Sequence, residues 1–208
     1  MYSKIVEPYN LLKDEETVIS VNFKTDKDWS KSVFNSIKSN IVKSLRDKQE
    51  NKCCYCRSEL GFDLKAVDIE HIIPKSLYPN FTFNMKNLAL SCPGCNTSKG
   101  SKDVLHKPIT SYPLSGSNIK IIHPHFDDYY SSINIHNSAI FEGKDDKGCE
   151  TIKLCKLYRL NKVLENKQRC MSNQSPIQQI IESIRNADDN EKSELMALLK
   201  PLILFSKK

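Results

Sequence analysis

Two Cys-x-x-Cys pairs constrain the fold of this chain more than any other feature of its sequence. Cys53 and Cys56 form the first pair, and Cys92 and Cys95 form the second. Four thiolates at this spacing are enough to close a tetrahedral structural zinc site. Chance spacing and a redox-active dithiol are the competing interpretations, but paired cysteines in a reducing compartment more often bind a metal. We therefore expect Zn²⁺ to join the two pairs.

The segment between the two pairs, residues 57–91, is longer than the roughly fifteen to twenty residues of a minimal zinc module. It contains two short strand candidates, residues 66–70 and 87–91, which are joined by a loop rich in turn-forming and aromatic residues. Pro93 then opens a predicted helix, because proline is tolerated in the first helical turn. The expected order is first cysteine pair, strand, loop, strand, second cysteine pair and short helix.

Outside this core the sequence predicts further helices and strands. Residues 29–48 have apolar side chains at helical spacing with basic residues around them, and Thr25 or Asp28 is the expected cap. The apolar stripe of this basic helix consists of Val33, Ile37, Ile41 and Leu45. The other expected elements are a strand at 17–23, β-like pieces at 119–122 and 132–135, an acidic loop at 142–150, and helices at 151–169 and 177–206.

Length and composition favour one compact unit over residues 1–208. Within it we expect an N-terminal extension with the basic helix (1–50), a zinc-bearing core (51–105) and a mixed, then helical, C-terminal extension (106–208). No apolar run approaches the roughly 20 residues of a membrane span. The first residues lack the apolar stretch of a secretory signal. We expect a cytoplasmic protein that does not associate with membranes.

The net charge of +6 is compatible with a nucleic-acid partner but is weak evidence on its own. Its distribution is more informative, because the excess of lysine and arginine gathers around the cysteine-bearing segment. The helix expected at 29–48 is therefore the best candidate for contact with a phosphate backbone.

Chemistry-bearing residues stand at fixed places in this core. Glu70 lies directly beside His71 at the end of the first strand candidate, and Asn87 opens the second. Asn96 and Lys99 follow the last cysteine. The ordered run Cys53-x-x-Cys56, Glu70-His71-x-x-Pro74, Asn87-Leu88 and Cys92-x-x-Cys95-Asn96-x-x-Lys99 resembles the zinc-containing HNH endonuclease family.

This resemblance implies an α+β fold: a ββα-metal HNH core stapled by a four-cysteine zinc site and flanked by N- and C-terminal helical extensions. It implies DNA hydrolysis to 5′-phosphate and 3′-hydroxyl ends. His71 would be the general base, Glu70 and Asn96 the ligands of a catalytic Mg²⁺ or Mn²⁺, and Asn87 the residue that holds the loop orienting His71. Lys99 would contact the substrate phosphate.

Plainer interpretations stand beside each of these roles. Glu70 can be an ordinary strand carboxylate, Asn96 a helix cap and Lys99 a solvated lysine. Asp68 shares the strand face of Glu70 and is expected to support it. For the whole chain, the alternatives are a zinc-stabilised nucleic-acid-binding or adaptor module without turnover, and an HNH nuclease that cleaves RNA.

A looser resemblance covers most of the chain. Pro74-Lys75-Ser76, Tyr78-Pro79 and the later Leu160-Asn161 are similar to bacterial HNH proteins of anti-phage defence, in particular the HNH subunit of Septu-type and some retron systems. Those proteins pair with an ATPase subunit. This chain has no G-x-x-x-x-G-K-[ST] loop of its own, so the resemblance implies an ATPase partner in restriction or anti-phage defence.

Three further groups of residues are weaker candidates. His123 and His125 with Asp127 could form a second metal site, although a structural turn is the preferred interpretation. Aromatic residues could stack on bases, but residues of this kind more often belong to a core; they are Trp29, Tyr129 and Tyr130. The remaining thiols are expected to be small packing residues; they are Cys54, Cys149, Cys155 and Cys170.

Overall fold

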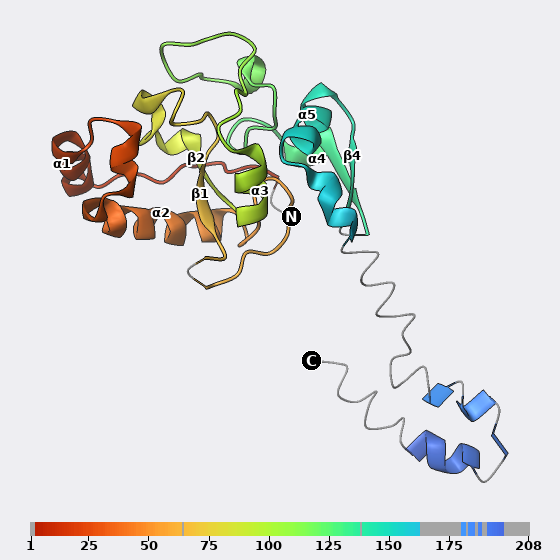
Figure 1. The fold of residues 1–208 in the computed structure, drawn as a ribbon. Helices are drawn as coiled ribbons and strands as arrows, with labels where there is room; N and C mark the ends of the chain where they lie inside the picture. The colour runs from red at the N-terminus through yellow and green to blue at the C-terminus, as the bar shows by residue number, and fades with distance from the viewer. Residues whose placement is uncertain are drawn as a thin grey trace. The chain divides into compact units, whose positions relative to one another are not determined.

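In the computed structural model the chain divides into two compact units, residues 1–159 and residues 160–208, whereas the sequence led us to expect one. The structure describes residues 3–63, 65–137, 139–162, 180–181, 183–185, 187–188 and 191–197. Within the second unit, residues 180–181, 183–185 and 191–197 are helical. They agree in type with parts of the helix expected at 177–206, but residues 187–188 are not helical and interrupt it, and its other residues lie outside the described part of the chain. The candidate site residues between Cys53 and Lys99 all belong to the first unit, whose helices and strands are labelled in Figure 1.

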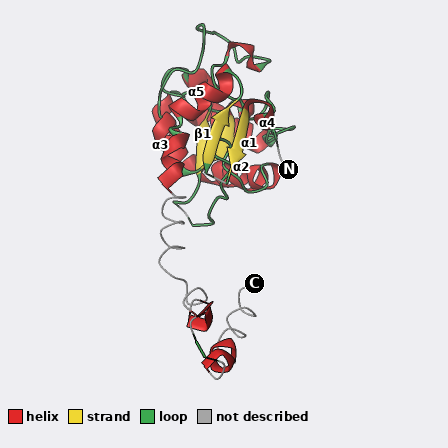
Figure 2. Ribbon diagram, turned by 90° about the vertical axis from the view of Figure 1, so that its right-hand side faces the viewer, coloured by secondary structure: helices red, strands yellow, loops and turns green. Residues whose placement is uncertain are grey.

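The core of the first unit is a strand hairpin followed by a short helix. Strands β1 (Asp68–His71) and β2 (Leu88–Ser91) pair antiparallel, so that Asp68 faces Ser91 and His71 faces Leu88. Helix α3 (Pro93–Lys99) follows directly and packs against β1. Helices surround the strands on several sides (Figure 2). The mixed fold with a ββα core that the sequence predicts is thereby confirmed.

The basic helix begins later than predicted. Helix α2 spans Asn35–Lys48 and buries Ile37, Ile41 and Leu45, three of the four residues of the expected apolar stripe. The fourth, Val33, is 43% exposed because residues before α2 form two 3₁₀ turns, η1 (Asp26–Ser30) and η2 (Ser32–Phe34). Thr25 caps η1, where the Asp28 carboxylate accepts a hydrogen bond from the Thr25 backbone N–H.

The strand predicted at residues 17–23 is wrong, because this segment belongs to helix α1 (Lys13–Asn22). Three acidic residues occupy its first turn, where the helix dipole favours negative charge; they are Asp14, Glu15 and Glu16. The Glu15 carboxylate accepts the Leu12 backbone N–H at 3.0 Å and the Asn40 amide of α2 at 2.8 Å. These local and tertiary bonds outweigh the β-branched composition of the segment.

The C-terminal part of the first unit carries a second hairpin. Strands β3 (Ile133–His136) and β4 (Ile140–Gly143) pair antiparallel between helices α4 (Tyr129–Ser132) and α5 (Asp146–Leu154). The acidic loop predicted at 142–150 is wrong, because the Asp145 carboxylate caps α5 by accepting the Gly148 N–H at 2.7 Å. Residues 119–122 form no strand, and Ile119 makes an isolated bridge with Leu105.

The remaining elements are single 3₁₀ turns. They are η3 (Pro79–Phe81), η4 (Met85–Asn87), η5 (Gly116–Asn118) and η6 (Leu157–Leu160). The helix predicted at 151–169 therefore divides between α5 and η6, and its end lies outside the described residues. In the part of the chain that the structure describes, no helix is long and apolar enough to cross a membrane.

Gln49, just after α2, joins that helix to the hairpin. Its side chain is fully buried, accepts the Leu90 N–H at 2.7 Å and donates to the carbonyls of Leu90 and Lys52 at 3.0 and 2.9 Å. Leu90 lies in β2, so this one amide satisfies backbone groups on the outer edge of the hairpin. The bond therefore places the basic helix alongside the strands that carry the candidate site.

We expect Gln49→Ala to lower the free energy of unfolding by about 2 to 4 kcal/mol, because it leaves a buried backbone N–H unpaired and opens a small cavity. Urea denaturation followed by circular dichroism measures this change. Ser36→Ala, on the exposed side of the same helix, is the matched control. Equal stability of the two variants would contradict the role given to Gln49.

Candidate HNH active site and metal cluster

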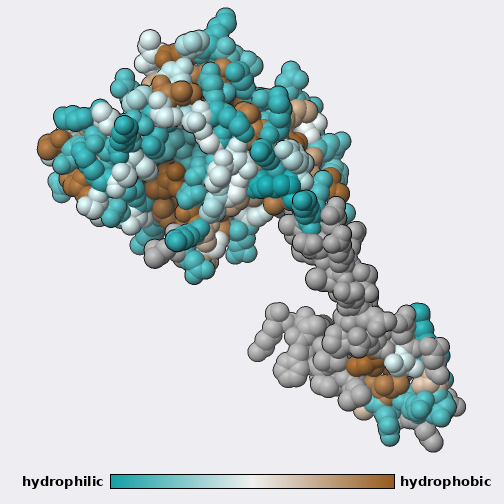
Figure 3. Space-filling model, in the orientation of Figure 1, coloured by the Kyte–Doolittle hydropathy of each residue, from teal (hydrophilic) through white to brown (hydrophobic). Residues whose placement is uncertain are grey.

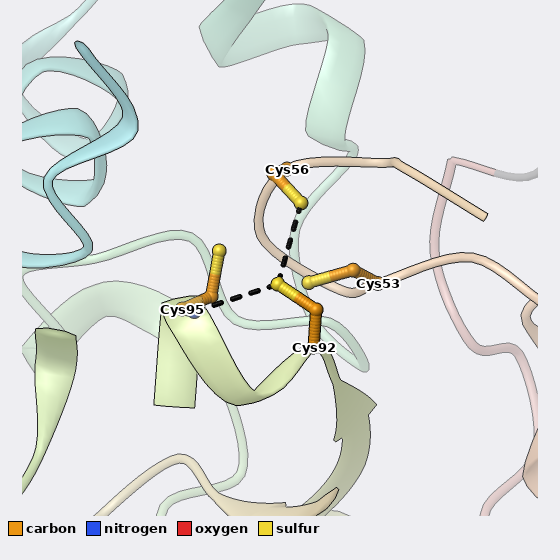
Figure 4. Close-up of side chains that lie close together, drawn as sticks. All are labelled: Cys53, Cys56, Cys92 and Cys95. Atoms are coloured by element: carbon orange, nitrogen blue, oxygen red, sulfur yellow. Dashed lines mark hydrogen bonds between the residues drawn. The ribbon is translucent and has the colours of Figure 1, made fainter. Parts of the chain in front are cut away.

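Four cysteine side chains from two separate segments point toward one another (Figure 4). All four sulfur atoms lie within 4.8 Å of one another, and Sγ of Cys56 is 3.8 Å from Sγ of Cys92. Sulfurs bound tetrahedrally at about 2.3 Å from one ion are about 3.8 Å apart. Hydrogen bonding with Cys53 lowers the pKa of Cys92 to about 7, which favours a thiolate near neutral pH. The cluster fits one tetrahedral metal ion.

Arg159 is a neighbour of this cluster that the sequence did not suggest. Its Nη2 donates a hydrogen bond to Cys95 Sγ at 3.2 Å, and its Nη1 donates to the Lys156 carbonyl at 3.0 Å. A Cβ atom on Gly94 would lie 2.9 Å from Nη2, so the glycine leaves room for the guanidinium. Four thiolates around a divalent ion carry net negative charge, and Arg159 offsets part of it.

His71 ends β1 and is held from two sides. Its Nε2 lies 3.2 Å from the Thr82 carbonyl, and its ring meets the Trp29 ring edge-on with centroids 4.6 Å apart. A carbonyl oxygen only accepts hydrogen bonds, so Nε2 carries the proton and Nδ1 keeps its lone pair. Burial, together with the charges of Lys75 and Lys99, lowers the pKa of His71 to about 3. The imidazole is therefore neutral at physiological pH.

Asn87 holds the loop that carries Thr82. The side chain is fully buried, its Oδ1 accepts the Ile73 N–H at 2.8 Å, and its Nδ2 donates to the carbonyls of Ile73 and Phe81 at 2.9 and 3.1 Å. One amide thus ties Ile73, at the start of the loop, to Phe81, one residue before the carbonyl that orients His71. The role of Asn87 in catalysis stays a prediction, which these bonds support.

Glu70 and Lys99 form a buried ion pair that the sequence did not suggest. Lys99 Nζ lies 2.6 Å from Glu70 Oε1, and both side chains are at most 3% exposed. The Tyr55 hydroxyl donates to the same oxygen at 3.1 Å, and Lys99 also donates to the His71 carbonyl at 2.9 Å. Burial raises the pKa of Glu70, against the opposing charge of Lys99. Lys99, expected at the substrate phosphate, points instead into the protein interior.

Asn96 lies on α3 and faces the strand. Its Nδ2 donates to Asp68 Oδ2 at 2.8 Å, so Asp68 contacts Asn96 and not Glu70, which the sequence led us to expect it to support. Glu70, His71 and Asn96 line one pocket of about 210 Å³, together with residues of the loop after β1. Among the described residues, no hydrogen bond reaches Asn96 Oδ1 or Glu70 Oε2. One amide oxygen and one carboxylate oxygen suit a hard cation such as Mg²⁺ or Mn²⁺.

His123 and His125 belong to a buried hydrogen-bond network. His123 Nε2 is 2.7 Å from the Tyr112 hydroxyl, which itself lies 3.3 Å from Asn87 Oδ1. The Asp127 carboxylate pairs with Lys147 at 2.7 Å. Within the described residues, the four cysteines are the only cluster of three or more potential metal ligands. The preferred interpretation of His123 and His125 as structural residues therefore agrees with the fold.

Among the other weak candidates, Trp29, Tyr129 and two of the remaining thiols pack against other parts of the protein. Trp29 packs on His71, and Tyr129 is fully buried with its hydroxyl donating to the Tyr55 carbonyl at 2.7 Å. Cys54 and Cys155 are buried, whereas Cys149 is exposed. Cys170 lies outside the described residues. Trp29 and Thr82 contact His71 from segments remote in sequence, and no local pattern marks either residue.

We expect Lys99→Met to cost about 3 to 5 kcal/mol of stability, because it leaves the Glu70 carboxylate buried without its cation. Loss of Lys99 raises the Glu70 pKa further above its unfolded value near 4.3, so the folded state holds a proton that the unfolded state releases. Stability of this variant therefore falls as pH rises. Urea denaturation at pH 6 and pH 8.5, without added divalent cation, measures both effects.

The exposed Lys107→Met serves as the control for Lys99→Met. The double variant Glu70→Gln with Lys99→Met removes both charges and should recover much of the lost stability. A double variant as unstable and as pH-sensitive as Lys99→Met alone would refute the pairing as the cause.

Comparison with known proteins agrees with this geometry. Residues 53–102 match the family model of HNH endonucleases. A curated relative, Septu protein PtuB from Bacillus thuringiensis, is 33% identical over 124 residues, which cover 60% of this chain and 43% of the relative. The chain thus spans less than half the length of that protein. The motif order, the ββα arrangement and the family match together identify residues 53–102 as an HNH endonuclease domain.

Proposed function

We propose that this protein is a metal-dependent endonuclease that hydrolyses phosphodiester bonds of DNA. The observation that carries the proposal is the setting of His71, whose Nε2 is anchored on the Thr82 carbonyl while Nδ1 is left as an acceptor. The residue lines the same pocket as Glu70 and Asn96. Phosphodiester cleavage by water requires a neutral, oriented imidazole as general base and, beside it, oxygen ligands for a metal ion.

In the proposed reaction His71 Nδ1 takes a proton from a water molecule. The resulting hydroxide attacks phosphorus in line, so that a new P–O bond forms while the bond to the 3′ oxygen breaks. The leaving oxygen takes a proton from solvent, and the products end in 5′-phosphate and 3′-hydroxyl. Asn87 keeps the loop closed by its bonds to Ile73 and Phe81, so the imidazole does not reorient during the transfer.

Glu70 and Asn96 would hold the catalytic cation at the pocket. When bound there, Mg²⁺ or Mn²⁺ supplies electrostatic stabilisation of the phosphate and of the leaving 3′ oxygen. Lys99 already lies 2.6 Å from Glu70 Oε1 and neutralises the buried carboxylate before any cation arrives. The free oxygen of Glu70 and the amide oxygen of Asn96 are then the available ligands. Asp68 keeps Asn96 in place through its hydrogen bond.

We place this nuclease in bacterial anti-phage defence or restriction. The similarity to a Septu protein supports this setting, as does the looser resemblance of residues 74–79 and 160–161 to defence HNH subunits. An ATPase subunit is the expected partner, because the HNH subunits of such systems pair with one. Invading DNA is met in the cytoplasm, which is the proposed location.

Plasmid nicking tests the proposed activity. Wild-type protein with Mg²⁺ or Mn²⁺ should convert supercoiled DNA to open circles, and EDTA should abolish this reaction. His71→Ala should lower the rate at least about 100-fold, because the general base contributes roughly that factor or more. A parallel series contains the partner ATPase and tests whether cleavage depends on that subunit.

A variant that leaves the fold intact is needed beside His71→Ala. Lys107→Ala changes an exposed lysine and should cleave like the wild type. If neither wild type nor the reconstituted complex nicks DNA, and His71→Ala changes nothing, the nuclease proposal fails. Cleavage of RNA in place of DNA under the same conditions would favour the ribonuclease alternative, and binding without cleavage would favour the adaptor.

The cysteine cluster should contain one Zn²⁺ per chain. Elemental analysis of purified protein should find zinc in the wild type and in His71→Ala, but not in Cys56→Ser, which removes one of the four thiolates. Cys149→Ser, at an exposed thiol outside the cluster, should retain its zinc and is the matched control. Retention of zinc by Cys56→Ser would contradict the four-thiolate site.

A further inference from the structure

An open groove lies between α2 and the residues Phe62, Asp63 and Val67, on the face shown in Figure 3. Its volume is about 710 Å³, and we call it the α2 groove. The apolar part of its lining consists of Val42, Phe62 and Val67, and the basic part consists of Lys38, Lys43 and Arg46. Hydrophobic residues gather at this place in Figure 3, with hydrophilic residues around them. The groove is therefore lined by both apolar and basic side chains.

The charge of the α2 groove is strongly one-sided. Three cations line it, and Asp63 is the one acidic residue among its lining residues in the described part of the chain. Lys43 is exposed, and no hydrogen bond or ion pair to its ammonium occurs among the described residues. Lysine and arginine gathered in one groove with a single acidic residue attract a polyanion such as a nucleic-acid backbone.

Phe62 gives the groove a second property. Its side chain is 80% exposed, although burying a phenylalanine is ordinarily favourable. The Arg46 guanidinium lies 4.7 Å from the ring centroid and also donates to the Gly61 carbonyl at 2.8 Å. Arg46 further contacts Asn51, so it fixes the neighbouring backbone while the ring stays in solvent. A ring held open beside cations is a platform on which a base can stack.

Trp29 contacts Lys38 of the α2 groove on one side and His71 on the other. Lys38 donates to the Trp29 carbonyl at 3.1 Å, and its ammonium lies 5.6 Å from the centroid of the indole. The same indole meets the His71 ring with centroids 4.6 Å apart. One aromatic residue therefore contacts both a wall of the groove and the proposed general base.

We infer that the α2 groove binds a single-stranded stretch of nucleic acid, with phosphates at Lys38 and Lys43 and one base stacked on Phe62. Stacking on Phe62 needs an unpaired base, which a closed duplex does not offer. The inference that the groove binds a single strand stands by itself. That this strand is the substrate of the HNH site rests on the proposed function. An acidic protein partner would use the same cations but would gain little from the open aromatic ring.

Fluorescence anisotropy in EDTA tests this inference without cleavage. The probes are labelled oligo(dT) of 20 nucleotides and a blunt-ended 20-base-pair duplex, each titrated with full-length protein. The single strand should bind more tightly, and Phe62→Ala should weaken that binding by about 5- to 100-fold while leaving duplex binding unchanged. Lys43→Gln should reduce the slope of log affinity against log salt by about 0.7.

Lys107→Gln, at an exposed lysine outside the groove, is the matched control and should bind like the wild type. Thermal melting checks that Phe62→Ala is folded, which its high exposure leads us to expect. Unchanged oligo(dT) affinity in Phe62→Ala overturns the inference, as does equal competition by poly-glutamate. His71→Ala should retain full binding. Nicking of DNA without Phe62-dependent binding would overturn only the groove inference. Phe62-dependent binding without nicking would overturn only the proposed nuclease activity.

Discussion

The meeting of four thiols in one place is the constraint on which the rest of the HNH domain depends. It joins the turn that follows α2 to the junction between β2 and α3, two segments separated by the whole hairpin. Strands of four residues bury too little surface to hold a hairpin by themselves. With the ends of the motif tied together, α3 is brought against β1, and Asn96 comes to face Asp68.

A buried charge pair joins the hairpin to α3. Glu70 and Lys99 face each other in the interior, and Tyr55 supplies a further hydrogen bond to the carboxylate. Such a pair is expensive to bury and strongly destabilising to break. The pair also positions the candidate site. The ammonium that neutralises Glu70 donates to the His71 carbonyl and so fixes the end of β1.

Sequence patterns were most reliable where chemistry restricts the choice of residue. The cysteine pairs, the hairpin and α3 follow from local spacing, and the loop-holding bonds of Asn87 support the role predicted for it. The strand predicted at 17–23 failed because a helix there is stabilised by its acidic first turn and by a bond from Asn40 to Glu15. The interior place of Lys99 was not predictable, because lysine is ordinarily exposed and its partner Glu70 lies on a strand far away in sequence.

The family match spans residues 53–102, yet the contacts that complete the domain come from outside that range. Gln49 satisfies the backbone of β2, Trp29 covers His71, Tyr129 binds the Tyr55 carbonyl and Arg159 reaches Cys95. The limits of the family match are therefore not the limits of a folding unit. A fragment cut to residues 53–102 would leave the β2 backbone, the His71 ring and the Cys95 sulfur without these partners.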